Sequence, residues 1–341
     1  MQNKFHRKDF LKLAVLANAS LLTKPVQAFT DNLSAVIPSL SINVVYYKKG
    51  DAQYEVLRKG FNKRINKFPA IIAQCNNTQG VAEAIQYAIA NNLPVAVKSG
   101  GHCMEGFSCN NGGMVINLSA LNKVSWVNTE IIKVGPGCTL SHLYDTILPK
   151  GKIIPAGSCG TVGVGGLVLG GGYGLMSRKL GLACDSLVEV TMVDGRGNIR
   201  NSNTDKDLLW ACKGGGNGNF GVITELKFKT HTAPATLQSF RFKAYKVNTA
   251  RAKAILKNWF EVSANLPQSC FSAYVLNGKN AYILLTTTEK PTSAIEKAIQ
   301  QLSLLADKTT RGLPIPITSA LKTFYGIQHP VYFKNSSAGL Y

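Results

Sequence analysis

The sequence predicts an α+β protein whose N-terminal part alternates strands and helices and whose C-terminal part forms a separate α+β domain. Three observations predict this class. A strand–helix–strand pattern covers residues 70–98, the composition shifts at Thr232-Ala233-Pro234, and a strand–helix–strand–strand–helix pattern follows over residues 237–306. The last pattern is typical of a sheet that has helices on one face and leaves the other face open.

The elements are assigned in chain order from hydrophobic periodicity and capping residues. Residues 44–66 are polar and mixed, so we expect them to be irregular. A strand over 70–74, a helix capped by Thr78 and a strand over 93–98 follow. Further strands are expected at 114–118, 131–134, 188–193, 222–230, 237–246, 271–277 and 281–288, and further helices at 139–148, 205–212, 249–264 and 292–306. Residues 307–341 carry no clear pattern.

An excess of positive charge limits the classes of partner. The chain has 38 lysines and arginines against 18 acidic residues, a formal net charge of +20 at pH 7. This balance allows binding to acidic surfaces or anionic ligands. Because the basic residues are spread along the chain, with no arginine-rich arm or zinc-finger spacing, we expect no nucleic-acid partner. A basic exported protein that binds an anionic surface without redox chemistry is one alternative function.

The N-terminus has the order of regions found in an export signal. A basic stretch from Lys4 to Lys12 precedes an apolar stretch from Leu13 to Leu22, and Val26-Gln27-Ala28 offers a cleavage site. We therefore expect residues 1–28 to be a signal peptide and the protein to be periplasmic or secreted. The basic stretch resembles a twin-arginine signal with Lys8 in place of the second arginine, and an amphipathic helix is the alternative. The apolar stretch is too short for a stable membrane anchor.

The cysteine spacing argues against a metal site. None of the eight cysteines belongs to a C-x-x-C pair, so structural zinc and thioredoxin chemistry are not expected. An exported protein can form disulfides, for which Cys103 and Cys109 are one candidate pair.

Glycine clusters are the candidate ligand-binding loops. Residues 216–221 satisfy G-x-G-x-x-G, but a predicted helix precedes them and a strand follows, the reverse of a dinucleotide-binding turn. The other two glycine clusters are Ser99-Gly100-Gly101 and residues 157–166. Their glycines let backbone N–H groups turn toward one anion. These two loops suit a dinucleotide pyrophosphate held between two subdomains, with purely structural turns as the alternative.

Two potential nucleophiles, His102 and Cys159, lie one in each of these two loops. Beside a bound cofactor both side chains are competent nucleophiles. A hydrogen-bonded surface histidine and an inert core cysteine are the alternative interpretations.

Three motifs resemble those of the berberine-bridge-enzyme-like FAD-linked oxidases. Residues 98–106, K-S-G-G-H-C-M-E-G, resemble the family's R-S-G-G-H-x-x-E-G. Residues 157–174 resemble its G-x-C-x-T-V-G-x-G-G…G-G-G-Y-G segment, and residues 214–224 resemble its G-G-G-x-G-N-F-G-V-V-T segment. The order and spacing of the motifs also agree.

The resemblance implies the vanillyl-alcohol-oxidase fold: a PCMH-type FAD-binding domain of two α/β subdomains, followed by an α+β substrate domain with an antiparallel sheet. These domains are placed at residues 29–232 and 233–341. The second is expected to be partial, because residues 333–337 resemble a family segment from the middle of the substrate domain. A truncated relative that binds FAD with little or no catalytic activity is therefore a second alternative.

The resemblance also implies FAD attached twice, with His102 bonded to the 8α-methyl carbon and Cys159 to C6 of the ring. Further cofactor-binding positions are implied at Ser99, Gly100, Gly101, Gly160, Thr161, Val162, Gly163, Gly165, Gly166, Gly221, Val222 and Ile223. Family members oxidise small molecules, either sugars or secondary metabolites, by hydride transfer to flavin N5. Val162, three residues after the cysteine, favours O2 as the acceptor, which would give H2O2.

The chain departs from the family motifs at two positions beside the implied linkages. Lys98 replaces an arginine, which keeps the charge and loses the planar fork. Gly160 replaces a proline, which we expect to loosen the loop of Cys159. No catalytic base is assigned. Tyr274 and Tyr282 lie on predicted substrate-domain strands, where ordinary cross-strand packing is the commoner explanation.

Overall fold

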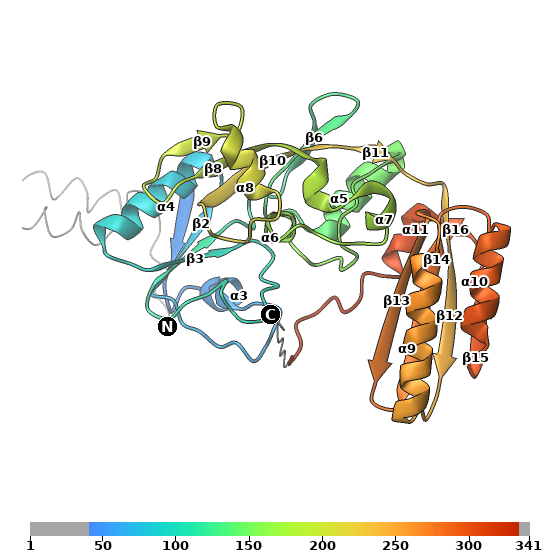
Figure 1. Cartoon of the computed structure of the whole chain (residues 1–341). Helices are drawn as coiled ribbons and strands as arrows, with labels where there is room; N and C mark the ends of the chain where they lie inside the picture. Colours follow the sequence, from blue (N-terminus) through green and yellow to red (C-terminus); the bar gives the residue numbers. More distant parts are fainter. Residues whose placement is uncertain (1–40, 334–341) are drawn as a thin grey trace, which may run out of the picture. The chain divides into compact units, whose positions relative to one another are not determined.

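The computed structural model describes residues 41–333, which form three large sheets with their helices and one two-stranded sheet of β7 (Lys152–Ile153) and β11 (His231–Thr232) (Figure 1). The predicted signal peptide lies outside these residues. Within residues 41–333, no helix is both long and apolar enough to cross a membrane.

The first sheet carries the Ser99 loop at the end of a strand. Its order is β1 (Val44–Tyr47), β2 (Ile71–Cys75), β4 (Met114–Asn117) and β3 (Val95–Lys98), and β2, β4 and β3 run parallel. Helix α4 (Thr78–Ala90) connects β2 to β3 and buries its apolar face against the sheet. The predicted cap at Thr78 is wrong by one position, because the Asn77 side chain accepts the bond from the Gly80 N–H. Residues 44–66, expected to be irregular, contain β1 and helix α3 (Tyr54–Arg58).

The second sheet is antiparallel and packs against the largest hydrophobic core. Its strands are, in order, β5 (Val124–Trp126), β6 (Ile131–Val134), β10 (Val222–Lys229), β8 (Leu187–Val193) and β9 (Ile199–Asn201). Helix α5 (Leu140–Ile147) begins at the predicted cap, Thr139. Asp205 caps helix α8 (Lys206–Cys212). The long glycine-rich run contains two short helices that the sequence pattern does not reveal, α6 (Val164–Leu169) and α7 (Ser177–Leu180).

The third sheet belongs to the C-terminal α+β part. Its order is β13 (Cys270–Asn277), β14 (Asn280–Thr287), β12 (Thr236–Ala244) and β15 (Lys308–Arg311), all antiparallel. Helices α9 (Thr249–Ala264) and α10 (Ser293–Ser303) pack on one face. The prediction of an α+β chain with an antiparallel C-terminal sheet is therefore confirmed.

The segment after the third sheet turns back to the second core. β15, β16 (Ile315–Pro316) and α11 (Ile317–Lys322) all lie where the sequence shows no pattern. Ile317, Ala320 and Leu321 of α11 are buried in the core of the second sheet rather than under α9 and α10. The residues after α11 consequently start beside the glycine-rich run.

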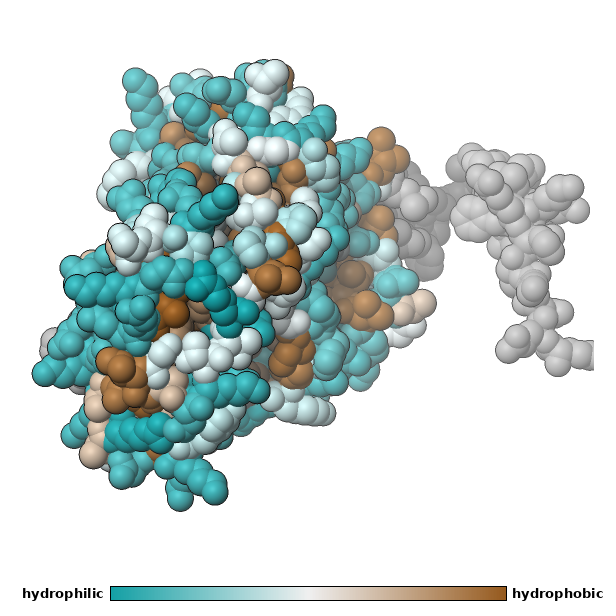
Figure 2. All heavy atoms as spheres, turned by 90° about the vertical axis from the view of Figure 1, so that its right-hand side faces the viewer, coloured by the Kyte–Doolittle hydropathy of each residue, from teal (hydrophilic) through white to brown (hydrophobic). Residues whose placement is uncertain are grey.

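Exposed apolar side chains form separate small groups on the mostly hydrophilic face shown in Figure 2. Scattered apolar residues are normal on a folded surface and indicate no binding site by themselves.

Candidate FAD site

The loops of His102 and Cys159 touch through their backbones. A side chain on Gly100 would place its Cβ 2.8 Å from the Cα of Gly163, and closer still to the Gly163 nitrogen. The Ser99 hydroxyl donates to the Pro136 carbonyl, 2.6 Å away, beside the same contact. Gly101 has φ +70, a left-handed conformation that favours glycine. Glycine at these positions thus permits the close approach of two segments about sixty residues apart in sequence.

One hydroxyl lies between the two nucleophiles. Nε2 of His102 is 2.8 Å from Oγ1 of Thr161, and Sγ of Cys159 is 3.8 Å from the same oxygen. Burial lowers the pKa of His102 below that of a free imidazole, which favours the neutral ring at neutral pH. The structure therefore brings His102, Cys159 and Thr161 together, as the sequence predicts.

Phe61, which sequence reasoning did not identify, stacks on His102. Their ring centroids are 4.0 Å apart and the planes are inclined by 23°. The Phe61 N–H also donates to the Gly101 carbonyl at 2.9 Å. No residue pattern around Phe61 indicates this contact, because its partner is 41 positions away in a different loop.

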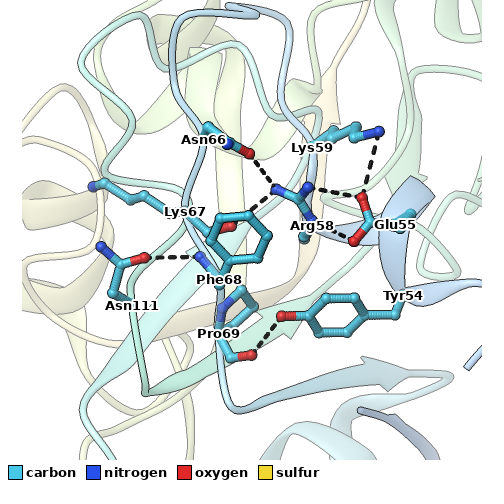
Figure 3. A network of polar contacts seen from close by, with 9 residues as sticks. All are labelled: Tyr54, Glu55, Arg58, Lys59, Asn66, Lys67, Phe68, Pro69 and Asn111. Atoms are coloured by element: carbon cyan, nitrogen blue, oxygen red, sulfur yellow. Dashed lines mark hydrogen bonds and ion pairs between the residues drawn. The ribbon is translucent and has the colours of Figure 1, made fainter. Parts of the chain in front are cut away.

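A polar network anchors the segment on both sides of Phe61 (Figure 3). The buried Arg58 guanidinium donates to both carboxylate oxygens of Glu55, at 2.9 and 2.7 Å, and to Asn66 Oδ1 at 2.8 Å. Its carbon lies 4.2 Å from the centroid of the Phe68 ring. The Tyr54 hydroxyl donates to the Pro69 carbonyl at 2.7 Å. These bonds hold residues 54–69 in one conformation and so fix where Phe61 meets His102.

Lys98, the first departure from the family motif, supports the same region. Its ammonium donates to the carbonyls of Leu57 (2.6 Å) and Lys59 at the end of α3. Burial lowers the pKa of Lys98 to about 8. The stem lies under Gly101, where a Cβ would come within 2.9 Å of the lysine Cε. Lys98 thus ties α3 to the loop that precedes His102.

Gly160, the second departure, donates one hydrogen bond that a proline could not donate. Its N–H donates to the Tyr325 carbonyl at 3.2 Å, and its own carbonyl accepts from the Ser141 N–H at 2.9 Å. A Cβ there would lie 2.8 Å from the Tyr325 ring. Contrary to the expectation of a looser loop, Gly160 is held on both sides, since glycine leaves room for Tyr325 and supplies a donor.

Residues 325–333 continue from this contact to the segment of Phe61, and we call them the strap. The Val331 N–H donates to the Phe61 carbonyl at 3.0 Å, and the Lys63 N–H donates to the Val331 carbonyl at 2.8 Å. The Phe333 N–H donates to Asn62 Oδ1 at 3.1 Å. The strap therefore joins the loop of Cys159 to the residues that stack on His102.

Several backbone donors beside the nucleophiles are free to bind an anion. Within residues 41–333, the N–H groups of Gly100, Gly101, His102, Thr161 and Gly163 have no hydrogen-bond acceptor. Buried or half-buried N–H groups without a partner are costly, and clusters of them form concave anion sites. The two loops therefore fit a phosphate-bearing cofactor.

The third predicted loop is arranged differently. Val222 and Ile223 are buried in strand β10, and no hydrogen bond within residues 41–333 joins residues 221–223 to the other two loops. The G-x-G-x-x-G run 216–221 does lie between helix α8 and strand β10, the inverted context expected from the sequence. It is not a Rossmann turn.

The structure also shows the state of the cysteines and the positions of Tyr274 and Tyr282. All eight cysteines are free thiols, so the candidate disulfide between Cys103 and Cys109 is not formed. Tyr274 packs under α9, with its ring near Trp259 and its hydroxyl 3.5 Å from the Ala252 carbonyl. Tyr282 lies on the opposite face of the third sheet, because it stands one register position away. Of these two tyrosines, Tyr282 is the one on the face of the sheet that α9 and α10 do not cover.

The chain is similar in sequence and in fold to known FAD-linked proteins. Residues 69–203 match the family model of an FAD binding domain. The chain is 38% identical over 197 residues to the uncharacterized FAD-linked oxidoreductase YvdP of Bacillus subtilis, covering 56% of this chain and 44% of that protein. It is 32% identical over 273 residues to berberine bridge enzyme-like 21 of Arabidopsis thaliana, covering 77% of this chain and 50% of that protein. The structure of the carbohydrate oxidase from Microdochium nivale in complex with a substrate analogue has a TM-score of 0.76 at 29% identity, covering 84% of this chain and 63% of that chain.

The fold and the two loops define an FAD-binding domain of the PCMH type. More particularly, the chain is a homologue of the berberine-bridge-enzyme-like and related FAD-linked oxidases, as its motifs indicate. It spans about half the length of the curated relatives it matches.

Proposed function

We propose that the chain is an oxidoreductase that carries FAD covalently on His102 and Cys159. The observation that supports this most is the position of both nucleophiles at the Thr161 hydroxyl, beside five free backbone N–H groups. A pair of structural loops needs neither feature. The proposal extends to an exported, periplasmic or secreted protein, on the basis of residues 1–28.

The residues of the chain have separate roles in this proposal. The free N–H groups of the two loops bind the pyrophosphate, and residues 221–223 border the adenine half. His102, held by Phe61 and Thr161, bonds to the 8α-methyl carbon, while Cys159 bonds to C6. Each linkage would replace one C–H bond of the flavin and one N–H or S–H bond of the side chain, so two protons and two electrons would be released per linkage, with O2 as the oxidant. Holding the ring at two points fixes its orientation toward the substrate.

The proposed reaction is oxidation of a small molecule at a carbon that bears a C–H bond and an adjacent O–H. Bound FAD supplies the two-electron acceptor for the C–H bond, with O2 as the final acceptor, which gives H2O2. A sugar substrate is supported by the likeness to a carbohydrate oxidase. A secondary metabolite is supported by the likeness to berberine bridge enzyme-like proteins.

Anaerobic reduction tests this function. Purified protein is mixed with a panel of sugars and benzylic alcohols without O2, and the flavin absorbance near 450 nm is followed. We expect at least one compound to bleach it and O2 to restore it with release of H2O2. A yellow protein that no compound bleaches would contradict catalysis and favour a binding role. A colourless protein retained on a polyanion resin would support the non-redox alternative.

A further inference from the structure

The hydroxyl of Thr161 connects the two nucleophiles. Its Oγ1 lies 2.8 Å from Nε2 of His102 and 3.8 Å from Sγ of Cys159. All three side chains are half-buried, and they come from the two loops that meet at Gly100 and Gly163. A thiol, a hydroxyl and an imidazole therefore form one continuous series of hydrogen-bonding groups.

This series allows two arrangements of its protons. In the first, the neutral ring carries its proton on Nδ1, the thiol donates to Oγ1, and the hydroxyl donates to Nε2. In the second, each of the two protons has moved one step toward the ring, so that Nε2–H donates to Oγ1 and the hydroxyl donates to a thiolate. Going from the first to the second transfers one proton from Cys159 to His102. Thr161 can support both, because a hydroxyl donates and accepts at the same time.

The state of the His102 ring favours its use as the proton acceptor. Burial lowers the pKa of His102, so the ring is neutral at neutral pH and Nε2 can hold a lone pair toward Thr161. Phe61 stacks on the ring with centroids 4.0 Å apart, which keeps Nε2 at this position. Removal of the thiol proton matters because the thiolate, not the thiol, is the nucleophilic form of cysteine.

Titratable groups on the His102 side have contacts of their own. The Lys98 ammonium donates to carbonyls at the end of α3. The Lys63 ammonium lies 5.7 Å from the centroid of the Tyr332 ring. Sγ of Cys103 accepts from the Phe107 N–H at 3.4 Å. These contacts direct the three groups toward partners other than Thr161.

The same holds for titratable groups on the Cys159 side. Asp145 of α5 pairs with Lys322 of α11 at 3.1 Å. On the strap, His329 is exposed to solvent. Burial raises the pKa of Tyr325, which keeps its phenol protonated at neutral pH. The hydrogen-bond route from Cys159 through Thr161 thus leads to His102.

We propose that Thr161 is the proton relay for attachment of FAD at Cys159, accepting the thiol proton on Oγ1 while it passes its own proton to Nε2 of His102. This inference rests on the proposed function, because it concerns the bond between Cys159 and FAD. In that step the S–C6 bond forms while the S–H and C6–H bonds break. The thiol proton goes to Nε2 through Thr161, the other proton goes to solvent, and O2 takes the two electrons.

Digestion of the whole purified protein with trypsin measures the two attachments separately. His102 and Cys159 fall in the tryptic peptides 99–123 and 153–178. FAD bonded to both residues joins these peptides, whereas FAD bonded to His102 alone stays on the first. Mass spectrometry gives the joined fraction in the protein as purified and during further incubation in air.

Thr161→Val keeps the shape of the side chain and removes the hydroxyl. We expect it to lower the joined fraction at least tenfold, which is a small effect for the loss of acid–base assistance. Thr161→Ser keeps the hydroxyl and should restore joining. Thr204→Val is the matched control, because its hydroxyl donates to the Asn201 carbonyl in an exposed turn, and it should behave as the wild type.

The pH of the incubation separates proton transfer from mere positioning of the sulfur. In Thr161→Val, joining should become faster as the pH is raised from 7 to 9, because hydroxide then removes the thiol proton directly. In Thr161→Ser, joining should depend less on pH, since the relay already supplies the thiolate at pH 7.

Three outcomes would overturn the proposal while the proposed function stands. They are wild-type joining in Thr161→Val, a loss in Thr161→Ser equal to that in Thr161→Val, and a loss in Thr161→Val that raising the pH does not reduce. The last two would show that the side chain acts through its shape or by placing the sulfur.

A wild-type protein without covalent FAD would contradict the proposed function and still decide the proposal. Cys159 is then a free thiol, and its rate of alkylation by iodoacetamide at pH 7 reports how readily it loses its proton. We expect the wild type to react at least fivefold faster at Cys159 than Thr161→Val does. Equal rates would overturn the relay.

Discussion

Gly100→Ala is the substitution that examines the contact between the two loops most directly. The added Cβ would lie 2.8 Å from the Gly163 Cα, whereas ordinary contact begins at 3.4 Å. Both sides of this contact are backbone, so no side chain can rotate away, and the loops must separate by several tenths of an ångström. Overpacking of this kind costs about 1–3 kcal/mol. We expect a loss near the upper end, together with displacement of the free N–H groups.

The assay compares flavin content and thermal unfolding of Gly100→Ala with those of Gly195→Ala. Gly195 lies in an exposed turn, and a Cβ there would meet nothing within 4 Å. We expect the first variant to lose most of its flavin absorbance relative to protein absorbance and to unfold at a lower temperature. The control is expected to match the wild type. If Gly100→Ala retains full flavin content and thermal stability, the argument that this close approach builds the site is refuted.

Three further predictions concern residues around the loops. Lys98 has a pKa of about 8 in the folded chain, against about 10.4 unfolded, so the unfolded chain binds more protons between those values. The stability of the wild type relative to Lys98→Met should thus rise by about 3 kcal/mol across this window in urea titrations, and a difference independent of pH would contradict it. Phe61→Leu should slow covalent attachment of FAD while Phe61→Tyr preserves it, as followed by mass spectrometry during reconstitution; equal rates would show that the stacking is incidental. Val331→Pro, which removes the bond to the Phe61 carbonyl, should lower flavin content more than Val331→Ala does, and identical contents would exclude a role for the strap.

The sequence predicts those parts of the fold that depend on local pattern. Helix α4 and strand β2 follow from apolar spacing, and Thr139 is a local cap, so these elements are found where expected. Strand β15 is not foreseen, because its four residues, Lys308–Arg311, are all exposed and carry no alternation. It pairs only because β12 offers a free edge, which is a property of the folded sheet.

Some residues of the candidate site can likewise be found from local sequence, and others cannot. Glycines and nucleophiles in adjacent motif positions identify the loops of His102 and Cys159. Phe61 and the strap contribute through contacts with residues far away in sequence, and no local signal marks them. The local sequence around Gly160 indicates a looser loop for the same reason, since the contact that holds Gly160 comes from Tyr325, a residue 165 positions further along the chain.

The most direct test of the central claim is the intact mass and visible spectrum of the purified protein before and after acid precipitation. The account predicts that yellow colour stays with the precipitate and that the mass exceeds that of the polypeptide by one FAD, less the hydrogens lost on attachment. His102→Ala and Cys159→Ala should each keep a single linkage, and the double variant should release FAD on precipitation. An unmodified mass with free FAD in the supernatant would contradict covalent attachment through these two residues.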